Sequence, residues 1–267
     1  MRSVLLAFAA ALVAALPVSA QEAWAKTRLD TSPRHAEWVP VKHGSRTVQC
    51  FVVYPEVKDK APVVLVIHEI YGLSDWARGV ADQLAAAGYI AIAPDLLSGM
   101  ASGGGGTAEF PNRDAITKAV SALSPDQVTA DLKAAADYAK ALPAASGKLF
   151  VTGFCWGGAK SFLFATERSD LAAAFVFYGV PPKSTEDIAQ IGCPVYGFYA
   201  GDDSRVSSTV PATIDIMKKA GKVYEPVIYD GAKHGFMRAG EDPDSKIPAN
   251  KTAHDEAWTR LLALLKK

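Results

Sequence analysis

Short runs of consecutive apolar residues alternate along this chain with longer segments in which apolar residues recur every three to four positions. The short runs have the length and β-branched content of buried strands, and the longer segments have the spacing of amphipathic helices. Strands are expected at 37–41, 47–54, 62–68, 89–94, 148–152, 172–178, 194–200 and 224–229. Helices are expected at 75–87, 112–123, 125–142, 159–168, 210–220 and 253–265.

The order of these elements predicts the fold class. After an opening pair of strands joined by a polar turn, strands and helices alternate to the end of the chain. This order predicts an α/β fold with a mostly parallel central sheet and helices on both faces. The chain has 267 residues, about half of them apolar, and no internal repeat or long linker. We therefore expect residues 21–267 to form a single domain.

The first 20 residues have the pattern of a signal peptide. Arg2 supplies the positive start, residues 4–16 are apolar but too short to span a bilayer, and Val18, Ser19 and Ala20 form a small-x-small cleavage site. We therefore expect an exported protein, periplasmic or secreted, with no membrane segment after cleavage. The alternative is an uncleaved membrane anchor.

Charge and cysteine content narrow the classes of partner. Lys plus Arg equals Asp plus Glu, so the formal net charge is zero and no basic stripe indicates a nucleic acid partner. An oxidising compartment would favour a disulfide between Cys50 and Cys193. Both lie in apolar strand-like runs, however, so two buried thiols are favoured over a pair.

The six residues 153–158 have the Gly-x-nucleophile-x-Gly pattern of a nucleophile elbow, with Cys155 at the nucleophile position. A sharp turn from strand to helix strains its central residue and pushes that side chain out over the sheet. A thiol at the positive end of a helix tends to ionise, and the thiolate is the nucleophile. The alternative is a simple turn with a buried structural cysteine.

Other reactive side chains follow later strands, whose carboxyl ends meet at one edge of an open sheet. Asp202 and Asp203 follow the strand 194–200, and His234 follows the strand 224–229. The order of nucleophile, acid and histidine is that of the α/β-hydrolases. His234 is the expected base. Either aspartate could orient it, because periodicity does not choose between them.

Glu69, directly after the strand 62–68, is a less expected carboxylate. It would lie near the elbow and could act as a second base; otherwise it is a surface acid or the partner of an arginine such as Arg78. We expect the neighbouring His68 to be structural. The pair is not a zinc motif, because Gly72 stands where H-E-x-x-H requires a histidine. No metal or organic cofactor is implied.

Five ordered motifs together resemble the dienelactone hydrolase (carboxymethylenebutenolidase) family, a cysteine-using branch of the α/β-hydrolases. The resemblance runs from about Arg34 to the last helix. The motifs are residues 68–73, 93–96, 153–158, 201–206 and 234–238. Five motifs in order are far more specific than any one of them.

The resemblance implies an α/β-hydrolase fold and roles for four side chains. It identifies Cys155 as the nucleophile, His234 as its base and Asp203, not Asp202, as the triad acid. It also matches Glu69 to a glutamate that holds the thiol at rest and helps to deprotonate it once substrate arrives.

The resemblance further implies how substrate is held. It matches the backbone N–H groups of Ile70 and Trp156 to an oxyanion hole, and Arg238 and Tyr71 to substrate-binding positions. The better-known members carry a second substrate arginine near the position of Gly99, which this sequence lacks. We therefore expect ester or lactone chemistry without identifying dienelactone as the natural substrate.

The expected function is hydrolysis of a small-molecule ester or lactone by a cysteine nucleophile. The alternatives are an exported thiol redox or sensor protein, and a ligand-binding member of the fold without catalysis. A monomer is favoured. The glycine run 103–106 is either a mobile lid or a long connection.

Overall fold

The computed structural model describes residues 22–267. Its strands are β1 (Ala36–His43), β2 (Arg46–Val53), β3 (Ala61–Ile67), β4 (Ile90–Pro94), β5 (Ala145–Phe154), β6 (Leu171–Phe177), β7 (Val195–Ala200) and β8 (Tyr224–Tyr229). Its α-helices are α1 (Ala23–Asp30), α2 (Asp75–Ala86), α3 (Arg113–Ser121), α4 (Pro125–Lys140), α5 (Trp156–Glu167), α6 (Thr185–Gln190), α7 (Ser204–Ser207), α8 (Val210–Lys219), α9 (Phe236–Glu241) and α10 (Pro248–Leu265).

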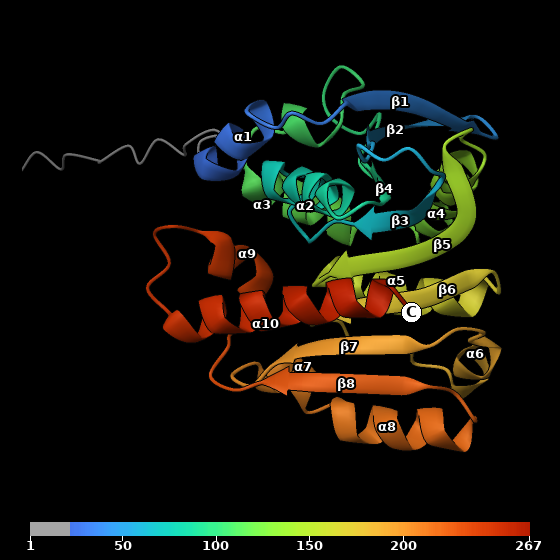
Figure 1. Cartoon of the computed structure of the whole chain (residues 1–267), viewed down its shortest axis with the longest axis vertical. Coiled ribbons are helices and arrows are strands. Elements are labelled where there is room, and N and C mark those ends of the chain that lie inside the picture. The colour runs from blue at the N-terminus through green and yellow to red at the C-terminus, as the bar shows by residue number, and fades with distance from the viewer. Residues whose placement is uncertain (1–21) are drawn as a thin grey trace, which may run out of the picture.

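The eight strands form one sheet in the order β1-β2-β4-β3-β5-β6-β7-β8 (Figure 1). The β1–β2 and β2–β4 pairs are antiparallel, and all the other pairs are parallel. From β3 the chain passes to β4 on one side, and from β4 it crosses back over β3 to β5 on the other side, so the strand order reverses at β3. Ligands of open α/β sheets bind at such a switch point. The predicted α/β fold is confirmed.

Helices cover both faces of this sheet, and each face has its own hydrophobic core. Consecutive residues of β3 show the alternation: Val63, Leu65 and Ile67 lie in one core, and Val64 and Val66 lie in the other. Side chains of α3, α4, α5, α6 and α8 pack into the first core. Those of α1, α2, α9 and α10 pack into the second, and α10 crosses the sheet on that side (Figure 1).

Four helices were not expected from the sequence. α6, α7 and α9 have 6, 4 and 6 residues, which is too short for an apolar period to be visible. α1 buries only Ala25 of its eight residues, so it carries no amphipathic stripe. α10 also begins earlier than expected, with Pro248 in its first turn, where the missing N–H costs nothing.

All three cysteines are free, and Cys50 and Cys193 are buried. The favoured prediction of two buried thiols is therefore confirmed. Burial raises the pKa of Cys50 to about 12 and that of Cys193 to about 11, so both are inert at neutral pH.

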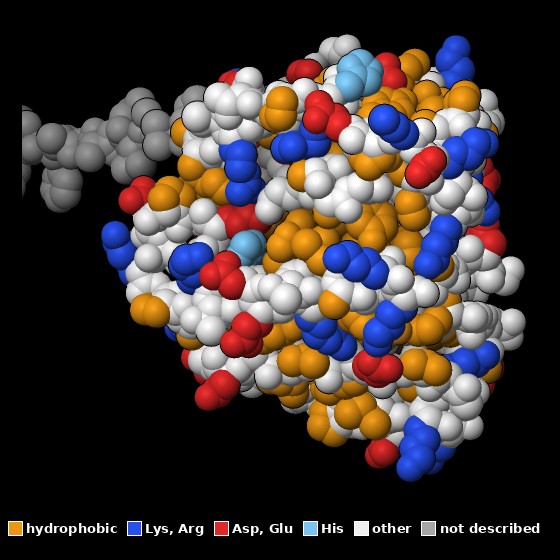
Figure 2. All heavy atoms as spheres, viewed as in Figure 1, with side chains coloured by type: hydrophobic (Ala, Val, Ile, Leu, Met, Phe, Trp, Pro, Cys, Tyr) orange, Lys and Arg blue, Asp and Glu red, His pale blue; other side chains and the backbone are white. Residues whose placement is uncertain are grey.

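The face of the molecule drawn in Figure 2 mixes positive and negative side chains with apolar areas, as expected for a chain without net charge. Within residues 22–267, no helix combines the length and apolar character that a bilayer crossing requires. The predicted signal peptide lies outside the described residues.

Candidate active site

Cys155 lies at the turn between β5 and α5, where the sequence predicts an elbow. Its backbone has φ 56° and ψ −115°, a conformation that costs a non-glycine residue about 1–3 kcal/mol. The turn is held from both sides: the N–H of Cys155 donates to the carbonyl of Phe177 at 3.0 Å, and its own carbonyl accepts from the N–H of Ala159 at 3.2 Å. The strain therefore stays in place and presents the thiol at the end of the sheet.

Two glycines of the elbow are required by close backbone contacts. A Cβ on Gly153 would lie 2.0 Å from the carbonyl oxygen of Gly157. A Cβ on Gly157 would lie 2.3 Å from the carbonyl oxygen of His68 and 2.4 Å from that of Ile67. Only glycine lets α5 start so close to the end of β3. This contact brings the loop after β3 to the thiol.

The thiol, an imidazole and a carboxylate form a continuous chain of contacts. His234 Nε2 lies 3.0 Å from Cys155 Sγ, and His234 Nδ1 lies 2.5 Å from Asp203 Oδ2. Asp203 is 7% exposed, whereas Asp202 is exposed and makes no contact with the ring. Of the two aspartates between which periodicity does not choose, Asp203 is the partner of His234. A carboxylate on Nδ1 fixes the tautomer in which Nε2 accepts a proton.

The thiol is less acidic than its place at a helix start predicts. Burial and, after it, the nearby charge of Glu69 raise the pKa of Cys155 to about 11. Hydrogen bonds from the backbone N–H groups of Trp156 and Ile70, and the charge of Arg205, lower it without offsetting burial. The expectation that the thiol tends to ionise by itself is therefore wrong. Loss of water on burial raises the thiol pKa by more than the start of α5 lowers it. The same two N–H groups were matched to the oxyanion hole, and they point at the sulfur.

Glu69 is buried, and its carboxylate is held by an arginine and a tyrosine. Arg238 Nε donates to Oε2 at 2.9 Å, and the hydroxyl of Tyr178 donates to Oε1 at 3.3 Å. Burial lowers the pKa of Arg238, but the charge and hydrogen bond of Glu69 outweigh it and leave that pKa raised. Arg78, the alternative partner, pairs with Asp75 instead. Glu69 thus acts on the thiol through its charge and not through a hydrogen bond.

Tyr178 is a site residue that the sequence did not reveal. It follows β6, has φ 40°, and is 1% exposed. Its ring packs edge-on against the imidazole of His234, with centroids 5.0 Å apart, while its hydroxyl contacts Glu69. The one signal in the sequence is its place at the carboxyl end of the strand expected at 172–178, on the edge where the other site residues gather.

His68 is buried and has the structural position expected. Its Nδ1 donates to the backbone carbonyl of Glu69 at 2.7 Å, and its ring stacks on Trp156 with centroids 5.6 Å apart. Burial lowers its pKa, so the ring is neutral. These contacts fix the loop that carries Glu69 and Ile70 against the start of α5.

A cavity of about 300 Å³ opens onto the thiol and the imidazole. Its other lining residues are Ile70, Trp156, Ala159, Tyr178, Val180, Arg205 and Val206. Arg205 lies two positions after Asp203, inside a motif visible in the sequence, and its role was missed. The predicted substrate contacts Arg238 and Tyr71 do not line this cavity. Larger hollows near α9 and near Ser45 hold none of the triad side chains.

The glycine run 103–106 contributes three residues, Gly104, Gly105 and Gly106, to the lining of a separate hollow of about 750 Å³. Its end is anchored, because Asp95 accepts from both the N–H and the hydroxyl of Thr107 at 2.7 Å. Thr107 in turn accepts from the N–H of Leu73 at 3.1 Å. Through Thr107, this connection therefore anchors the loop that follows β3. Within residues 22–267, no group of three or more His, Cys, Asp or Glu side chains is arranged to hold a metal ion.

Comparison with known proteins gives the family. The family model described as "Dienelactone hydrolase family" matches residues 48–267. The chain belongs to the dienelactone hydrolase family. A Salmonella typhi protein named "Putative carboxymethylenebutenolidase" is 32% identical over 220 residues, 78% of each chain. An Escherichia coli K12 protein of the same name is 30% identical over 217 residues, 77% of each chain.

Solved structures agree. A crystal structure titled "Putative Dienelactone Hydrolase from Klebsiella pneumoniae subsp. pneumoniae MGH 78578" superposes with a TM-score of 0.76 at 26% identity, covering 88% of this chain and 99% of that one. The predicted family resemblance and the α/β-hydrolase fold are confirmed, and the chain is a hydrolase of this family.

Proposed function

We propose that this protein is a cysteine-nucleophile hydrolase of carboxylic esters or lactones. The observation that carries the proposal is the chain of contacts from Cys155 to His234 to Asp203, at 3.0 and 2.5 Å, facing an open cavity. This arrangement supplies a nucleophile, a base and an orienting acid in the order that acyl transfer requires.

In the first half of the reaction, Cys155 Sγ attacks the carbonyl carbon and its proton passes to His234 Nε2. The carbonyl oxygen becomes an oxyanion that accepts from the N–H groups of Ile70 and Trp156, each worth about 3–4 kcal/mol in comparable sites. The C–O bond of the ester then breaks, and the departing oxygen takes the proton from His234. The product is a thioester on Cys155 and a free alcohol, which stays attached when the substrate is a lactone.

In the second half, a water gives a proton to His234 Nε2 and its oxygen attacks the thioester carbon. The same two N–H groups receive the oxyanion. The C–S bond breaks, the sulfur leaves, and the proton returns from His234 to Cys155. The carboxylic acid is released and the protonated thiol of the resting state is restored, consistent with a thiol pKa of about 11.

Glu69 has a supporting part in this proposal. Its charge keeps the thiol protonated while the cavity is empty, because two negative charges in a buried site repel. Arg238 and Tyr71 remain proposed substrate contacts. Arg238 is engaged by Glu69 in this structure, so it would reach a ligand only by exchanging partners.

The cavity walls favour compact apolar acyl groups. Apart from the thiol, the imidazole and Arg205, the side chains that line it are apolar or aromatic. Esters and lactones are favoured over amides, because a sulfur leaves a tetrahedral intermediate more readily than an amine does.

A redox function is less well supported. Cys50 and Cys193 pack in the core on one face of the sheet, whereas Cys155 packs against the other. No second thiol is therefore positioned to resolve an oxidised Cys155. A thiol with a raised pKa is also a slow target for oxidants.

The proposal extends to the setting of the reaction. We propose an exported monomer, periplasmic or secreted, that acts on a small-molecule substrate without a metal or organic cofactor. Cell fractionation of the full chain tests the export: the protein is expected outside the cytoplasm and shortened by about the first 20 residues, and a full-length cytoplasmic protein contradicts it.

A substrate panel tests the hydrolase directly. The residue 21–267 chain is assayed with p-nitrophenyl esters and simple lactones, beside Cys155→Ala and Cys193→Ala. Turnover is expected in the parent and in Cys193→Ala, and is expected to be lost in Cys155→Ala. Undiminished turnover in Cys155→Ala overturns the nucleophile assignment.

A further inference from the structure

The side chain of Glu22 is buried, although it lies just before the first helix and outside the region that the family model matches. The carboxylate is 5% exposed. A buried carboxylate needs several partners to offset the loss of water. Its partners come from three other parts of the chain, α2, α3 and α9, which places the N-terminal segment against the centre of the protein.

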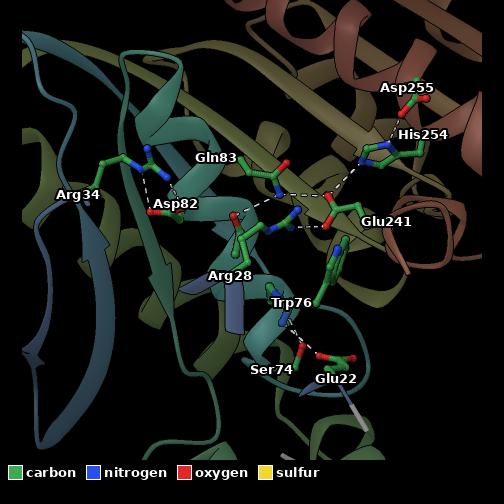
Figure 3. A network of polar contacts seen from close by, with 12 residues as sticks. Glu22, Arg28, Arg34, Ser74, Trp76, Asp82, Gln83, Glu241, His254 and Asp255 are labelled. Atoms are coloured by element: carbon green, nitrogen blue, oxygen red, sulfur yellow. Dashed lines mark hydrogen bonds and ion pairs between the residues drawn. The ribbon is translucent and has the colours of Figure 1, made fainter. Parts of the chain in front are cut away.

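Two arginines and a backbone N–H surround this carboxylate. Arg113 Nη2 donates to Oε1 at 2.6 Å, and Arg238 Nε lies 4.0 Å from the same oxygen. The N–H of Trp76, in the first turn of α2, donates to Oε2 at 3.1 Å (Figure 3). Both arginines lie over the ring of Tyr71, at 4.3 and 5.2 Å from its centroid. Charged and backbone donors of this kind are what a carboxylate requires.

The site is joined to the active site through a shared arginine. Arg238 Nε contacts Glu69 at 2.9 Å and Glu22 at 4.0 Å. A hollow of about 310 Å³ lies beside Glu22, lined also by Ser74, Thr107 and Phe110. Glu22 lines this hollow and Arg113 and Arg238 do not, so a small acid would reach the two arginines from it only where the Glu22 carboxylate is removed. Two carboxylates oppose a further acid here. Glu69 already pairs with Arg238, and Asp75 has a pKa that is raised first by burial and also by the charge of Glu22.

The segment that carries Glu22 is itself secured. Ala25 is buried in the core, and Arg28 Nη2 lies 2.5 Å from Glu241 of α9 (Figure 3). Glu241 is held in turn by Gln83 and His254. Tethering gives a side chain an effective concentration in the millimolar range, which a free ligand must exceed to replace it.

We propose that Arg113, Arg238 and the N–H of Trp76 form a carboxylate-binding site that Glu22 fills within its own chain. With Glu22 in place, a substrate carboxylate is excluded from Arg238, and the enzyme accepts esters and lactones that carry no acid group there. The carboxylate-binding site is inferred from the contacts of Glu22 with Arg113, Arg238 and the N–H of Trp76. Only its effect on substrate choice rests on the proposed hydrolase function.

Acetate is the probe for the site, because Glu22→Ala removes one methylene and the carboxylate. The melting temperature of the residue 21–267 chain is measured in about 50 mM sodium acetate and in sodium chloride of equal ionic strength. We expect Glu22→Ala to have a lower melting temperature than the parent. In acetate, but not in chloride, this melting temperature is expected to rise by about 2 °C or more. The parent, and Asp30→Ala at the exposed end of α1, are expected not to respond.

Two further variants make the result decisive. Glu22→Ala combined with Arg113→Met is expected to lose the acetate response. Glu22→Gln fills the site without charge, so it is expected to melt below the parent and not to respond to acetate. An acetate response shared by the parent, a response that persists without Arg113, or a Gln variant as stable as the parent overturns the proposal.

Substrate choice is measured separately, with p-nitrophenyl butyrate and mono-p-nitrophenyl succinate. The KM for the succinate ester is expected to fall about tenfold in Glu22→Ala while that for butyrate changes little. Equal changes for both esters contradict the effect on substrate choice. If no ester is turned over by any variant, the hydrolase proposal fails, and the acetate experiment still tests the site.

Discussion

Glu69 pairs with Arg238 at 2.9 Å and at the same time raises the pKa of the Cys155 thiol, with which it makes no hydrogen bond. The resting thiol is therefore protonated, and its proton is shared with His234 at 3.0 Å. Activation of the nucleophile then depends on what enters the cavity, and not on a preformed thiolate.

Glu69→Gln is expected to make the thiol more acidic. The thiol pKa of about 11 is raised first by burial and then by the charge of Glu69, so removing that charge lowers it. The rate of iodoacetamide labelling at Cys155, followed by mass spectrometry, should rise with pH to a midpoint near 11 in the parent and to a lower midpoint in the variant. An unchanged or higher midpoint would show that Glu69 does not act on the thiol through charge.

Arg205→Ala is expected to shift the same titration in the opposite direction. Arg205 lines the cavity, and its charge lowers the pKa of Cys155. Because its side chain is exposed, the shift should be smaller than that of Glu69→Gln and should shrink as salt is added. A labelling midpoint that falls in Arg205→Ala would contradict this account.

Asp203→Asn is expected to reduce kcat roughly 10²- to 10⁴-fold, because an amide can hold His234 in the wrong tautomer. Asp202→Asn is the matched control, since Asp202 is exposed and makes no side-chain contact with the imidazole. Its kcat should stay within about twofold of the parent on an ester substrate. Equal losses in both variants would remove Asp203 from the triad.

Gly157→Ala is expected to destabilise the fold by about 3 kcal/mol and to abolish turnover, because its Cβ would lie 2.3 Å from the carbonyl oxygen of His68. Gly79→Ala, in the middle of α2, is the control. Its Cβ would meet nothing closer than 3.6 Å, so a gain of about 0.5–1 kcal/mol is expected. Urea unfolding measures both. A Gly157 variant as stable as the parent would show that the elbow does not need this close contact.

The sequence predicted the sheet, and it predicted that Cys155, one of Asp202 and Asp203, and His234 meet at one edge, because each lies in the loop after a strand. The choice of Asp203 came from the family resemblance. It did not reveal the partner of Glu69, since Arg238 stands 169 positions further along the chain and an alternative, Arg78, was nearer. The acidity of Cys155 was predicted with the wrong sign. Local position at a helix start favours the thiolate, whereas burial, which depends on the whole fold, opposes it.

The N-terminal segment was the least predictable part. α1 has one buried residue and no apolar stripe, so periodicity could not show it. The position of Glu22 depends on Arg113 and Trp76, both supplied by distant segments. The sequence around either member of such an ion pair does not indicate the pairing, because each charged residue by itself has the pattern of a solvated surface residue.

The most direct test of the central claim is to find the acyl group during turnover. The residue 21–267 chain is mixed with excess p-nitrophenyl acetate, quenched in acid, digested and analysed by mass spectrometry. The account predicts one acetyl group on the peptide that contains Cys155, none on those with Cys50 or Cys193, and neither label nor turnover in Cys155→Ala. Acetyl found only on another residue, or full turnover in Cys155→Ala, would contradict it.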